Sequence, residues 1–312
     1  MRAVRQHAYD SPLVVEEVAT PVVGVSESLI SITYGAVNPL DVWISLGTVG
    51  AAGPLPRTPG CEGVGMTDDG QRVAFRGAGL GIVRDGAWAE QVAVPDVALA
   101  AIPEGCSDQE AAALGIPGVT ALDCLDVAEV GAGTTVLILG ASGGVSTIAM
   151  QLAKTRGARV IAQTTSPQRV DQVSRYAHEV VVADAAAIEE EVRLLAPDGV
   201  DVIIDPVAGP FAAPCVRLLA PGGRHVIYGA SAGSEFSFAP QEMYRKNARV
   251  IGYSGLPIAP AATARSQEAL FALVAAGTLE VVIADELSFD DANVAISRIR
   301  ENNVGGKLLL KP

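Results

Sequence analysis

A glycine-rich turn between a buried strand and a helix constrains this chain more than any other segment. The run 134–139 (TTVLIL) has the aliphatic and β-branched composition of a buried strand. The turn 140–146 (GASGGVS) follows directly, and apolar residues then recur at helical spacing until Gly157, a C-cap residue. Small residues at such a turn let the backbone approach a phosphate, and the first N–H groups of the helix face the anion. We therefore predict a dinucleotide site here, with a tight turn that binds nothing as the alternative.

The middle of the chain, from about residue 107, alternates strands with helices. After the glycine turn, further short strand patterns occur at 159–162, 200–204, 224–228 and 249–251. Helical stretches separate them, and Ser166-Pro167 has the N-cap and first-position pattern of a helix start. Such alternation predicts a parallel, doubly wound sheet.

The first hundred residues have a different pattern. Short alternating or β-branched runs at 13–18, 29–36, 71–75 and 87–94 are separated by breaks rich in Gly, Pro and Asp. This pattern predicts a compact all-β unit, a partly open barrel. The tail returns to helix (265–276), strand, helix (291–301) and a last strand (307–310), and we expect it to pack back on this first unit.

Composition excludes several classes of function. The 312 residues carry a formal net charge of -13, which disfavours nucleic acid and anionic lipid as partners. The four cysteines form no close pair, so a disulfide framework or a CxxC site is not expected. Neither a signal peptide nor a run of 18 apolar residues occurs, so we expect a cytoplasmic protein without a membrane span.

The end of the second strand of the alternating region indicates which dinucleotide binds. NAD proteins place a carboxylate there to accept from the ribose 2′-hydroxyl. Segment 163–169 (QTTSPQR) has none, but Thr165, Ser166 and Arg169 supply hydroxyls and a cation that suit a 2′-phosphate. We predict NADPH as the cofactor; in the alternative, Arg169 is only a solvated helix residue.

A series of motifs, in order along nearly the whole chain, resembles one family. It resembles the zinc-independent quinone oxidoreductase (zeta-crystallin-like) branch of the medium-chain dehydrogenase/reductase superfamily. The glycine turn matches the family's ASGGVG except at Ser146, where this chain departs from glycine. The other matching segments are Asn38-Pro39-Leu40-Asp41 (NPxD), 59–65 (PGxExxG), 86–90 (GxxAE), 111–121, 201–209, 222–224 and Gly305-Gly306-Lys307.

The resemblance implies an architecture, a cofactor and an assembly. It implies a GroES-like catalytic domain, a partly open β-barrel formed by residues 1–112 and 265–312, and a Rossmann domain formed by residues 113–264. It implies a homodimer paired through the last strand of the nucleotide-binding domain, at residues 248–254. Zinc-using relatives place Cys, His and a third ligand where this chain has Asn38, Cys61 and Ile116. One thiol cannot hold a catalytic zinc that needs three protein ligands, so no metal is expected.

The resemblance also assigns site residues. The substrate and catalytic positions match Asn38, Trp43 and Tyr253. The cofactor positions match Thr120, Ser142, Gly143, Gly144, Val145, Thr165, Ser166, Arg169, Gly209, Tyr228, Gly229, Ala230 and Ser231.

Three functions follow, in decreasing order of weight. The first is an NADPH-dependent reductase that transfers hydride to a quinone, an enone or another conjugated carbonyl acceptor. The second is an enoyl-thioester reductase, which a cleft for a long acyl arm beside a basic rim would favour. The third is a non-catalytic NADPH-binding structural or sensor protein, which tight binding without turnover would favour. Without zinc or a histidine relay, alcohol oxidation is disfavoured because it must remove a hydroxyl proton.

Overall fold

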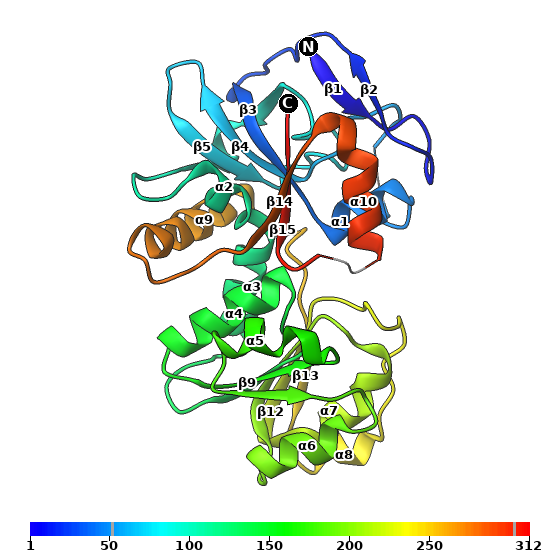
Figure 1. The fold of residues 1–312 in the computed structure, drawn as a ribbon, viewed down its shortest axis with the longest axis vertical. Helices are drawn as coiled ribbons and strands as arrows, with labels where there is room; N and C mark the ends of the chain where they lie inside the picture. Colours follow the sequence, from blue (N-terminus) through cyan, green and yellow to red (C-terminus); the bar gives the residue numbers. More distant parts are fainter. Residues whose placement is uncertain (51–52, 302–303) are drawn as a thin grey trace. The chain divides into compact units, whose positions relative to one another are not determined.

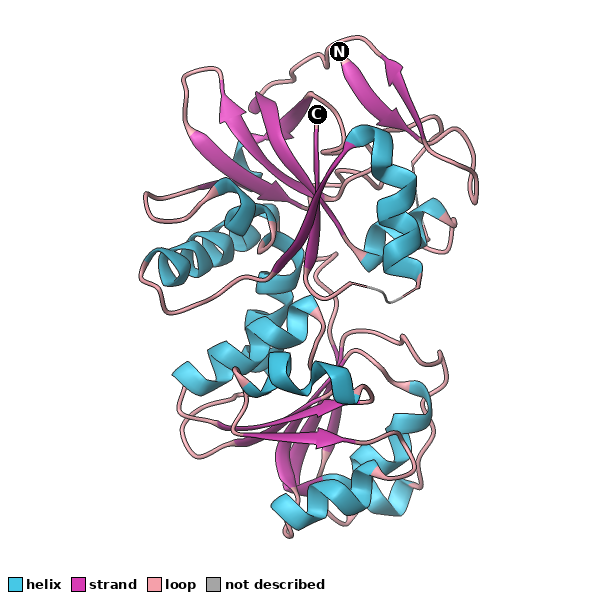
Figure 2. Cartoon of the chain, viewed as in Figure 1, coloured by secondary structure: helices cyan, strands magenta, loops and turns pink. Residues whose placement is uncertain are grey.

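The computed structural model describes residues 1–50, 53–301 and 304–312, and the chain divides into two compact units. The first unit combines Met1–Val119 with Leu256–Pro312, and the second comprises Thr120–Gly255. Each unit has a β-sheet of its own with helices packed on it (Figure 2). The C-terminal segment from Leu256 thus belongs to the first unit, and the domain boundaries at 112/113 and 264/265 stay a prediction.

The second unit is built on a parallel sheet of six strands in the order β10-β9-β8-β11-β12-β13 (Figure 1). In chain order this is the 3-2-1-4-5-6 arrangement of a doubly wound, dinucleotide-binding sheet, and its winding reverses between β8 and β11. The predicted fold class of this unit is confirmed. Its strands are β8 (Thr135–Ile138), β9 (Arg159–Thr164), β10 (Glu179–Val182), β11 (Val200–Asp205), β12 (Leu219–Ile227) and β13 (Arg249–Gly252).

Helices cover both faces of this sheet. In Figure 1, α4 and α5 lie on one face and α6, α7 and α8 on the other. Apolar side chains of α6 and α7, Ile188 and Cys215 among them, form one buried cluster with Leu137 and Ile203 of the strands. The elements are α3 (Gly115–Val127), α4 (Gly144–Thr155), η2 (Pro167–Arg169), α5 (Val170–Ser174), α6 (Ile188–Leu195), η3 (Gly209–Phe211), α7 (Ala212–Leu218) and α8 (Pro240–Tyr244).

The first unit contains a seven-stranded sheet in which β14-β15-β3-β4-β5-β7 are neighbours and β6 pairs with β3. All pairs are antiparallel except β14 with β15. The strands are β3 (Glu27–Val37), β4 (Glu62–Thr67), β5 (Arg72–Arg76), β6 (Gln91–Pro95), β7 (Leu99–Ala101), β14 (Ile283–Ser288) and β15 (Lys307–Lys311), with β1 (Arg2–Arg5) and β2 (Val14–Glu17) in a separate pair. Its helices are α1 (Pro39–Ser45), η1 (Asp96–Ala98), α2 (Asp108–Ala112), α9 (Pro260–Ala275), η4 (Phe289–Asp291) and α10 (Ala292–Arg300).

Strand direction in the first unit places three distant segments together. Strand β3 is antiparallel to both β4 and β15, with Gly35 opposite Gly63 and Val37 opposite Leu308. The carboxyl end of β3 therefore lies beside the first residues of β4 and β15. These are the ends at which the NPxD, PGxExxG and GGK motifs meet.

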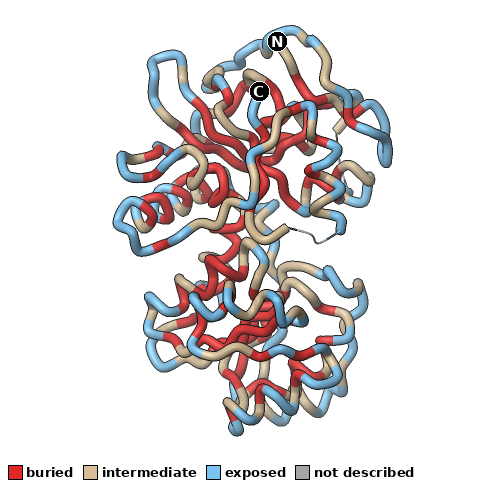
Figure 3. The backbone as a smooth tube through the Cα atoms, in the orientation of Figure 1, coloured by how far each residue is buried: buried red, intermediate tan, exposed pale blue. Residues whose placement is uncertain are grey.

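Buried residues concentrate on the strands of each unit (Figure 3). In the first unit Trp88 is fully buried, and its indole N–H donates to the Ala36 carbonyl over 3.2 Å. Gly60 packs against this ring at φ +101°, and a Cβ there would lie 2.5 Å from Trp88 Cδ1. The glycine of the PGxExxG motif is thus required by backbone conformation and by packing.

Several elements differ from the sequence prediction. Strands β1, β4, β7 and β10 were not predicted, strand β12 begins five residues before the predicted start at 224, and α1 forms within a segment predicted to be all β. Strand β10 has four residues and lies at the sheet edge, where only Val181 is buried, although its three consecutive valines have the β-branched composition of a strand. Within the described residues, no helix has the length and apolar character needed to span a bilayer.

Candidate functional site

The glycine turn of the second unit ends β8 and starts α4. Gly140 adopts φ +54°, and the Gly143 N–H donates to the Gly140 carbonyl over 3.0 Å. The first intrahelical bond runs from the Thr147 N–H to the Gly143 carbonyl over 2.9 Å. The N–H groups of Gly144, Val145 and Ser146 therefore lack an intrahelical acceptor, as the first groups of any helix do.

The surface of this turn is open to a ligand. Gly143 is exposed, and Ser142, Gly144 and Val145 are half-buried. Helix N-terminal N–H groups on a turn of small residues suit an anion such as a dinucleotide pyrophosphate. The residues present therefore fit the phosphates of a dinucleotide.

Gln163, a buried residue of β9, holds this turn from behind. Its Oε1 accepts from the Gly140 N–H over 3.1 Å, its Nε2 donates to the Ala183 carbonyl over 2.6 Å, and its own carbonyl accepts from the Ala141 N–H over 2.9 Å. We did not single out Gln163 from the sequence. The signal was there, because an amide inside an otherwise apolar strand needs buried partners.

The segment after β9 carries the polar groups expected to select the cofactor. Thr165 is exposed, and the half-buried Ser166 donates its hydroxyl to Gln168 Oε1 over 2.9 Å. The Arg169 guanidinium is 3.4 Å from Gln172 Oε1 and, among the residues described, pairs with no carboxylate. No carboxylate among the described residues therefore neutralises the charge of Arg169.

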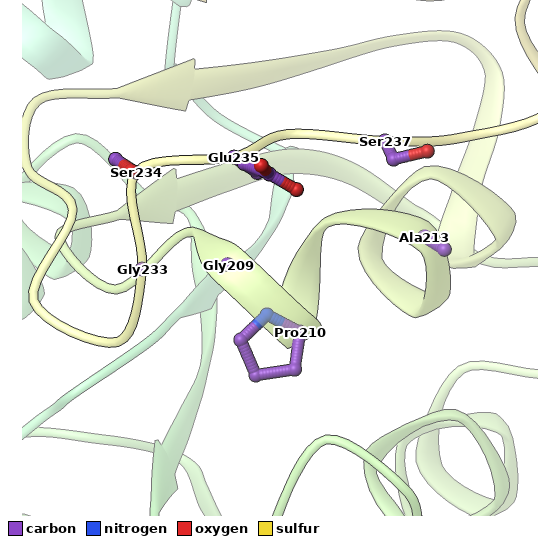
Figure 4. A pocket seen from close by; sticks show the side chains of 7 residues that line it. All are labelled: Gly209, Pro210, Ala213, Gly233, Ser234, Glu235 and Ser237. Atoms are coloured by element: carbon purple, nitrogen blue, oxygen red, sulfur yellow. The ribbon is translucent and has the colours of Figure 1, made fainter.

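The loops after β11 and β12 lie against one another. Gly209 has φ +53°, and a Cβ there would lie 2.7 Å from the Ala232 carbonyl oxygen; a Cβ on Gly229 would lie 2.8 Å from that of Pro206. The Ser231 N–H donates to the Pro206 carbonyl over 3.1 Å, and Ala230 and Ser231 are exposed. Beside them is an open pocket (Figure 4), lined by Gly209, Pro210, Ala213, Gly233, Ser234, Glu235 and Ser237.

Helix α3 and the residue after β13 contribute two further candidates. Thr120 is buried on α3. The Tyr253 hydroxyl donates to Asp123 Oδ2 over 2.7 Å, and Asp123 lies one turn along the same helix. The hydroxyl proton of Tyr253 is therefore directed at a carboxylate of its own unit.

In the first unit, Asn38 is the centre of a buried polar network. Its side-chain Nδ2 donates to Glu62 Oε1 over 2.8 Å, and its Oδ1 accepts from the Lys307 ammonium. Lys307 also pairs with Glu62 Oε1 at 2.7 Å, and Glu62 Oε2 accepts from the Ile116 N–H. Asn38 and Glu62 are 3% and 1% exposed, so their orientation is fixed by these contacts.

Asp41 and Cys61 line the same network. Asp41 accepts from the backbone N–H groups of Asn38 (2.8 Å) and Cys61 (3.1 Å), and burial raises its pKa to about 6. Burial, with Asp41 adding to it, raises the pKa of the Cys61 thiol well above its usual value. Without a metal ion beside it, Cys61 is thus a neutral thiol at physiological pH.

Trp43 on α1 is 43% exposed. Trp43 is therefore not a core residue, in contrast to Trp88, whose indole is fully buried. An exposed indole offers a flat apolar face and one N–H donor.

The side chains that could act as metal ligands decide whether this chain can hold zinc. Within residues 1–50, 53–301 and 304–312, no group of three or more His, Cys, Asp or Glu side chains could hold a metal ion. Asn38, Cys61 and Ile116 contribute one neutral thiol among them. The described residues therefore do not fit a catalytic zinc, which needs three protein ligands.

Comparison with known proteins agrees with this fold. Residues 144–285 match the family model described as zinc-binding dehydrogenase. The chain is 31% identical over 267 residues to a quinone oxidoreductase of Mus musculus, covering 81% of this chain and 80% of the mouse chain. It is 30% identical over 232 residues to an acryloyl-coenzyme A reductase of Sulfurisphaera tokodaii, covering 73% and 66%.

Solved structures give the same result. The quinone oxidoreductase of Thermus thermophilus, also solved as its complex with NADPH, superposes with a TM-score of 0.87 at 29% identity over the full length of both chains. The fold thus consists of a GroES-like unit and a Rossmann unit, as medium-chain dehydrogenases/reductases have. This chain belongs to the zeta-crystallin-like quinone oxidoreductase branch of that superfamily, whose named relatives here are oxidoreductases.

Proposed function

We propose that this protein is an NADPH-dependent reductase that transfers hydride to a quinone or another conjugated carbonyl acceptor without zinc. The observation that carries the proposal is the Asn38 network in the first unit. Where zinc-using relatives hold a metal, this chain has a buried carboxamide fixed by Glu62 and Lys307. Membership of the quinone oxidoreductase branch supports the same activity.

The chain's own residues would bind the cofactor, orient the acceptor and stabilise the charge that the acceptor gains. When bound, the nicotinamide cofactor supplies the hydride. The glycine turn would hold the pyrophosphate, and Asn38 would donate a hydrogen bond to the acceptor oxygen that gains charge. A conjugated acceptor spreads this charge over its own π system, so a hydrogen-bond donor suffices where alcohol oxidation needs a metal and a proton relay.

Trp43 in the first unit and Tyr253 in the second are two further proposed residues. The exposed indole of Trp43 would pack against a flat acceptor ring. Tyr253 would be a second donor, although its proton is directed at Asp123 in this structure. Asn38 is therefore the stronger candidate for the donor.

We expect Arg169→Ala to weaken the binding of NADPH far more than the binding of NADH. The variant loses one charge-assisted contact to the 2′-phosphate, worth about 1.5–3 kcal/mol. Michaelis constants for both cofactors check this, with Arg156→Ala as the matched control, because Arg156 pairs with Asp126 at the other end of α4. Equal effects of Arg169→Ala on NADPH and NADH would refute the assignment of Arg169 and the NADPH preference that rests on it.

We expect the purified protein to hold no stoichiometric zinc and to keep its activity in a chelator, because the donor set lacks three ligands. Elemental analysis before and after chelation, alongside turnover, measures this. One zinc per chain, lost together with activity, contradicts it.

The acryloyl-coenzyme A reductase relative favours a second candidate function, reduction of enoyl thioesters. NADPH oxidation over quinones, enones and enoyl thioesters, together with NADP⁺ reduction over simple alcohols, separates the candidates. Quinones or enones as the fastest substrates support the proposal, and thioesters as the fastest support the second candidate. Alcohol oxidation as fast as quinone reduction contradicts both, and tight NADPH binding without turnover indicates a structural or sensor protein.

We further propose a homodimer paired through β13. This strand ends the six-stranded sheet and exposes Arg249, Val250 and Gly252, so its outer edge offers unpaired backbone groups. Light scattering at micromolar concentration is expected to give about twice the 32.0 kDa chain mass. A stable monomer would exclude the dimer.

A further inference from the structure

Ser146 stands where the resembled motif has glycine, and it is fully buried in the first turn of α4. Its hydroxyl is 3.0 Å from the Leu139 carbonyl oxygen and 3.3 Å from the Tyr228 hydroxyl. Leu139 follows β8 and Tyr228 follows β12. The serine thus links the phosphate-binding turn to the end of a strand two places away in the sheet, which the glycine of the motif could not do.

The direction of these hydrogen bonds is fixed by chemistry. A carbonyl oxygen can only accept, so the one hydroxyl proton of Ser146 goes to Leu139. Ser146 Oγ is then the acceptor, and the Tyr228 hydroxyl is its donor. Burial raises the pKa of Tyr228, so the phenol keeps this proton at physiological pH. What remains at Tyr228 Oη is acceptor capacity alone.

The position of Tyr228 in the fold points to one half of the cofactor. Winding reverses between β8 and β11, and a dinucleotide binds across the strand ends at such a reversal, one mononucleotide on each side. The 2′-phosphate residues after β9 belong to the adenosine side. Strands β11 and β12 lie on the opposite side, so Tyr228 belongs to the nicotinamide side.

We propose that Ser146 is a positioning residue that makes Tyr228 Oη a dedicated hydrogen-bond acceptor for an N–H or O–H donor of the nicotinamide riboside half of the cofactor. The donors available there are the carboxamide NH₂ group and the ribose hydroxyls. The backbone holds the acceptor in place, because the Tyr228 N–H donates to the Asp205 carbonyl over 3.0 Å. This inference rests on the proposed binding of a nicotinamide cofactor.

The test is equilibrium binding of two ligands to the full-length protein. NADP⁺ contains the nicotinamide riboside, and adenosine 2′,5′-bisphosphate lacks it. We expect Tyr228→Phe and Ser146→Ala each to weaken NADP⁺ by roughly 2- to 10-fold, the effect of one hydrogen bond, and to leave the bisphosphate unchanged. The double variant should lose no more than Tyr228→Phe alone, since both substitutions remove the same contact.

Thr147→Ala is the matched control. Thr147 is buried next to Ser146 on α4, and its hydroxyl also donates to a backbone carbonyl, that of Gly144, over 3.0 Å. It has no link to Tyr228, so it reports what loss of such a hydroxyl does to the helix start alone. We expect it to change the ratio of the two affinities by less than either test variant does.

The two sources of the donor are separated with the 3-acetylpyridine analogue of NADP⁺, which lacks the carboxamide NH₂. If Tyr228→Phe no longer weakens the binding of this analogue, the donor is the carboxamide. If Tyr228→Phe weakens the binding of the analogue as much as that of NADP⁺, the donor is a ribose hydroxyl. Unchanged NADP⁺ affinity in both variants, or equal weakening of NADP⁺ and the bisphosphate, overturns the inference. Absence of NADP⁺ binding to the unmodified protein would instead refute the proposed function.

Discussion

Lys307→Met is expected to lower the free energy of unfolding by about 3–5 kcal/mol, the usual cost of leaving one member of a buried ion pair without its partner. Lys307 is 7% exposed and Glu62 is 1% exposed, and their charged atoms are 2.7 Å apart. Without the ammonium, the partners of Glu62 among the described residues are the Asn38 amide and the Ile116 N–H.

Urea unfolding at neutral pH measures this, and two variants serve as controls. Lys154→Met removes an exposed lysine from α4 and should change stability by less than about 0.5 kcal/mol. Adding Glu62→Gln to Lys307→Met removes both charges and should recover much of the loss. A Lys307→Met variant within about 1 kcal/mol of the unmodified protein at neutral pH would show that the pair contributes little.

The sheet of the second unit could be predicted from the sequence because its order follows from local patterns. From the run 134–139 and the helix after it, strand and helix patterns alternate clearly along the chain. The handedness of parallel crossovers then leaves few possible topologies for the sheet. Strand β10 was missed even though it contains three consecutive valines; it has only four residues, lies at the edge and buries only Val181. An apolar run this short does not by itself distinguish a strand from a helical segment.

The Asn38 network could not be predicted, although each of its members lies in a recognisable motif. Asn38, Glu62 and Lys307 are brought together by the pairing of β3 with β4 and β15, over separations of 24 and 245 or more positions. The sequence indicated Glu62 only as a residue of the PGxExxG motif. Glu62 orients Asn38 because of the register between the strands, and the motifs do not specify that register.

A second buried pair was also missed. His225 Nε2 lies 2.8 Å from Asp205 Oδ2, on neighbouring strands with neither side chain exposed. Asp205 Oδ1 accepts from the N–H groups of Val207 and Ala208 at 2.6 and 2.8 Å, so this carboxylate also shapes the turn after β11. From the sequence, Asp205 was only a residue of the matching segment 201–209 and His225 had no assigned role, because only the pairing of β11 with β12 brings them together.

Asn38→Ala is expected to lower turnover by about 10²–10³-fold while NADPH affinity stays nearly unchanged. An amide nitrogen carries two N–H groups, of which Glu62 takes one, and the described residues offer no acceptor for the second. Under the proposed function that second N–H stabilises the acceptor oxygen as it gains charge. Loss of one such donor costs about 2.7–4 kcal/mol in the transition state, whereas the phosphate contacts lie on α4 and after β9.

Asn293→Ala is the matched control, because it separates the loss of a donor from the loss of a structural amide. Asn293 lies in the same unit and bonds the backbone N–H and carbonyl of Leu13, both over 2.8 Å. Its alanine variant should lose stability but keep turnover, while Asn38→Ala loses turnover even at temperatures where both variants are folded. Full turnover in Asn38→Ala would remove Asn38 as the donor, and the exposed Trp43 indole N–H would then be the next candidate on α1.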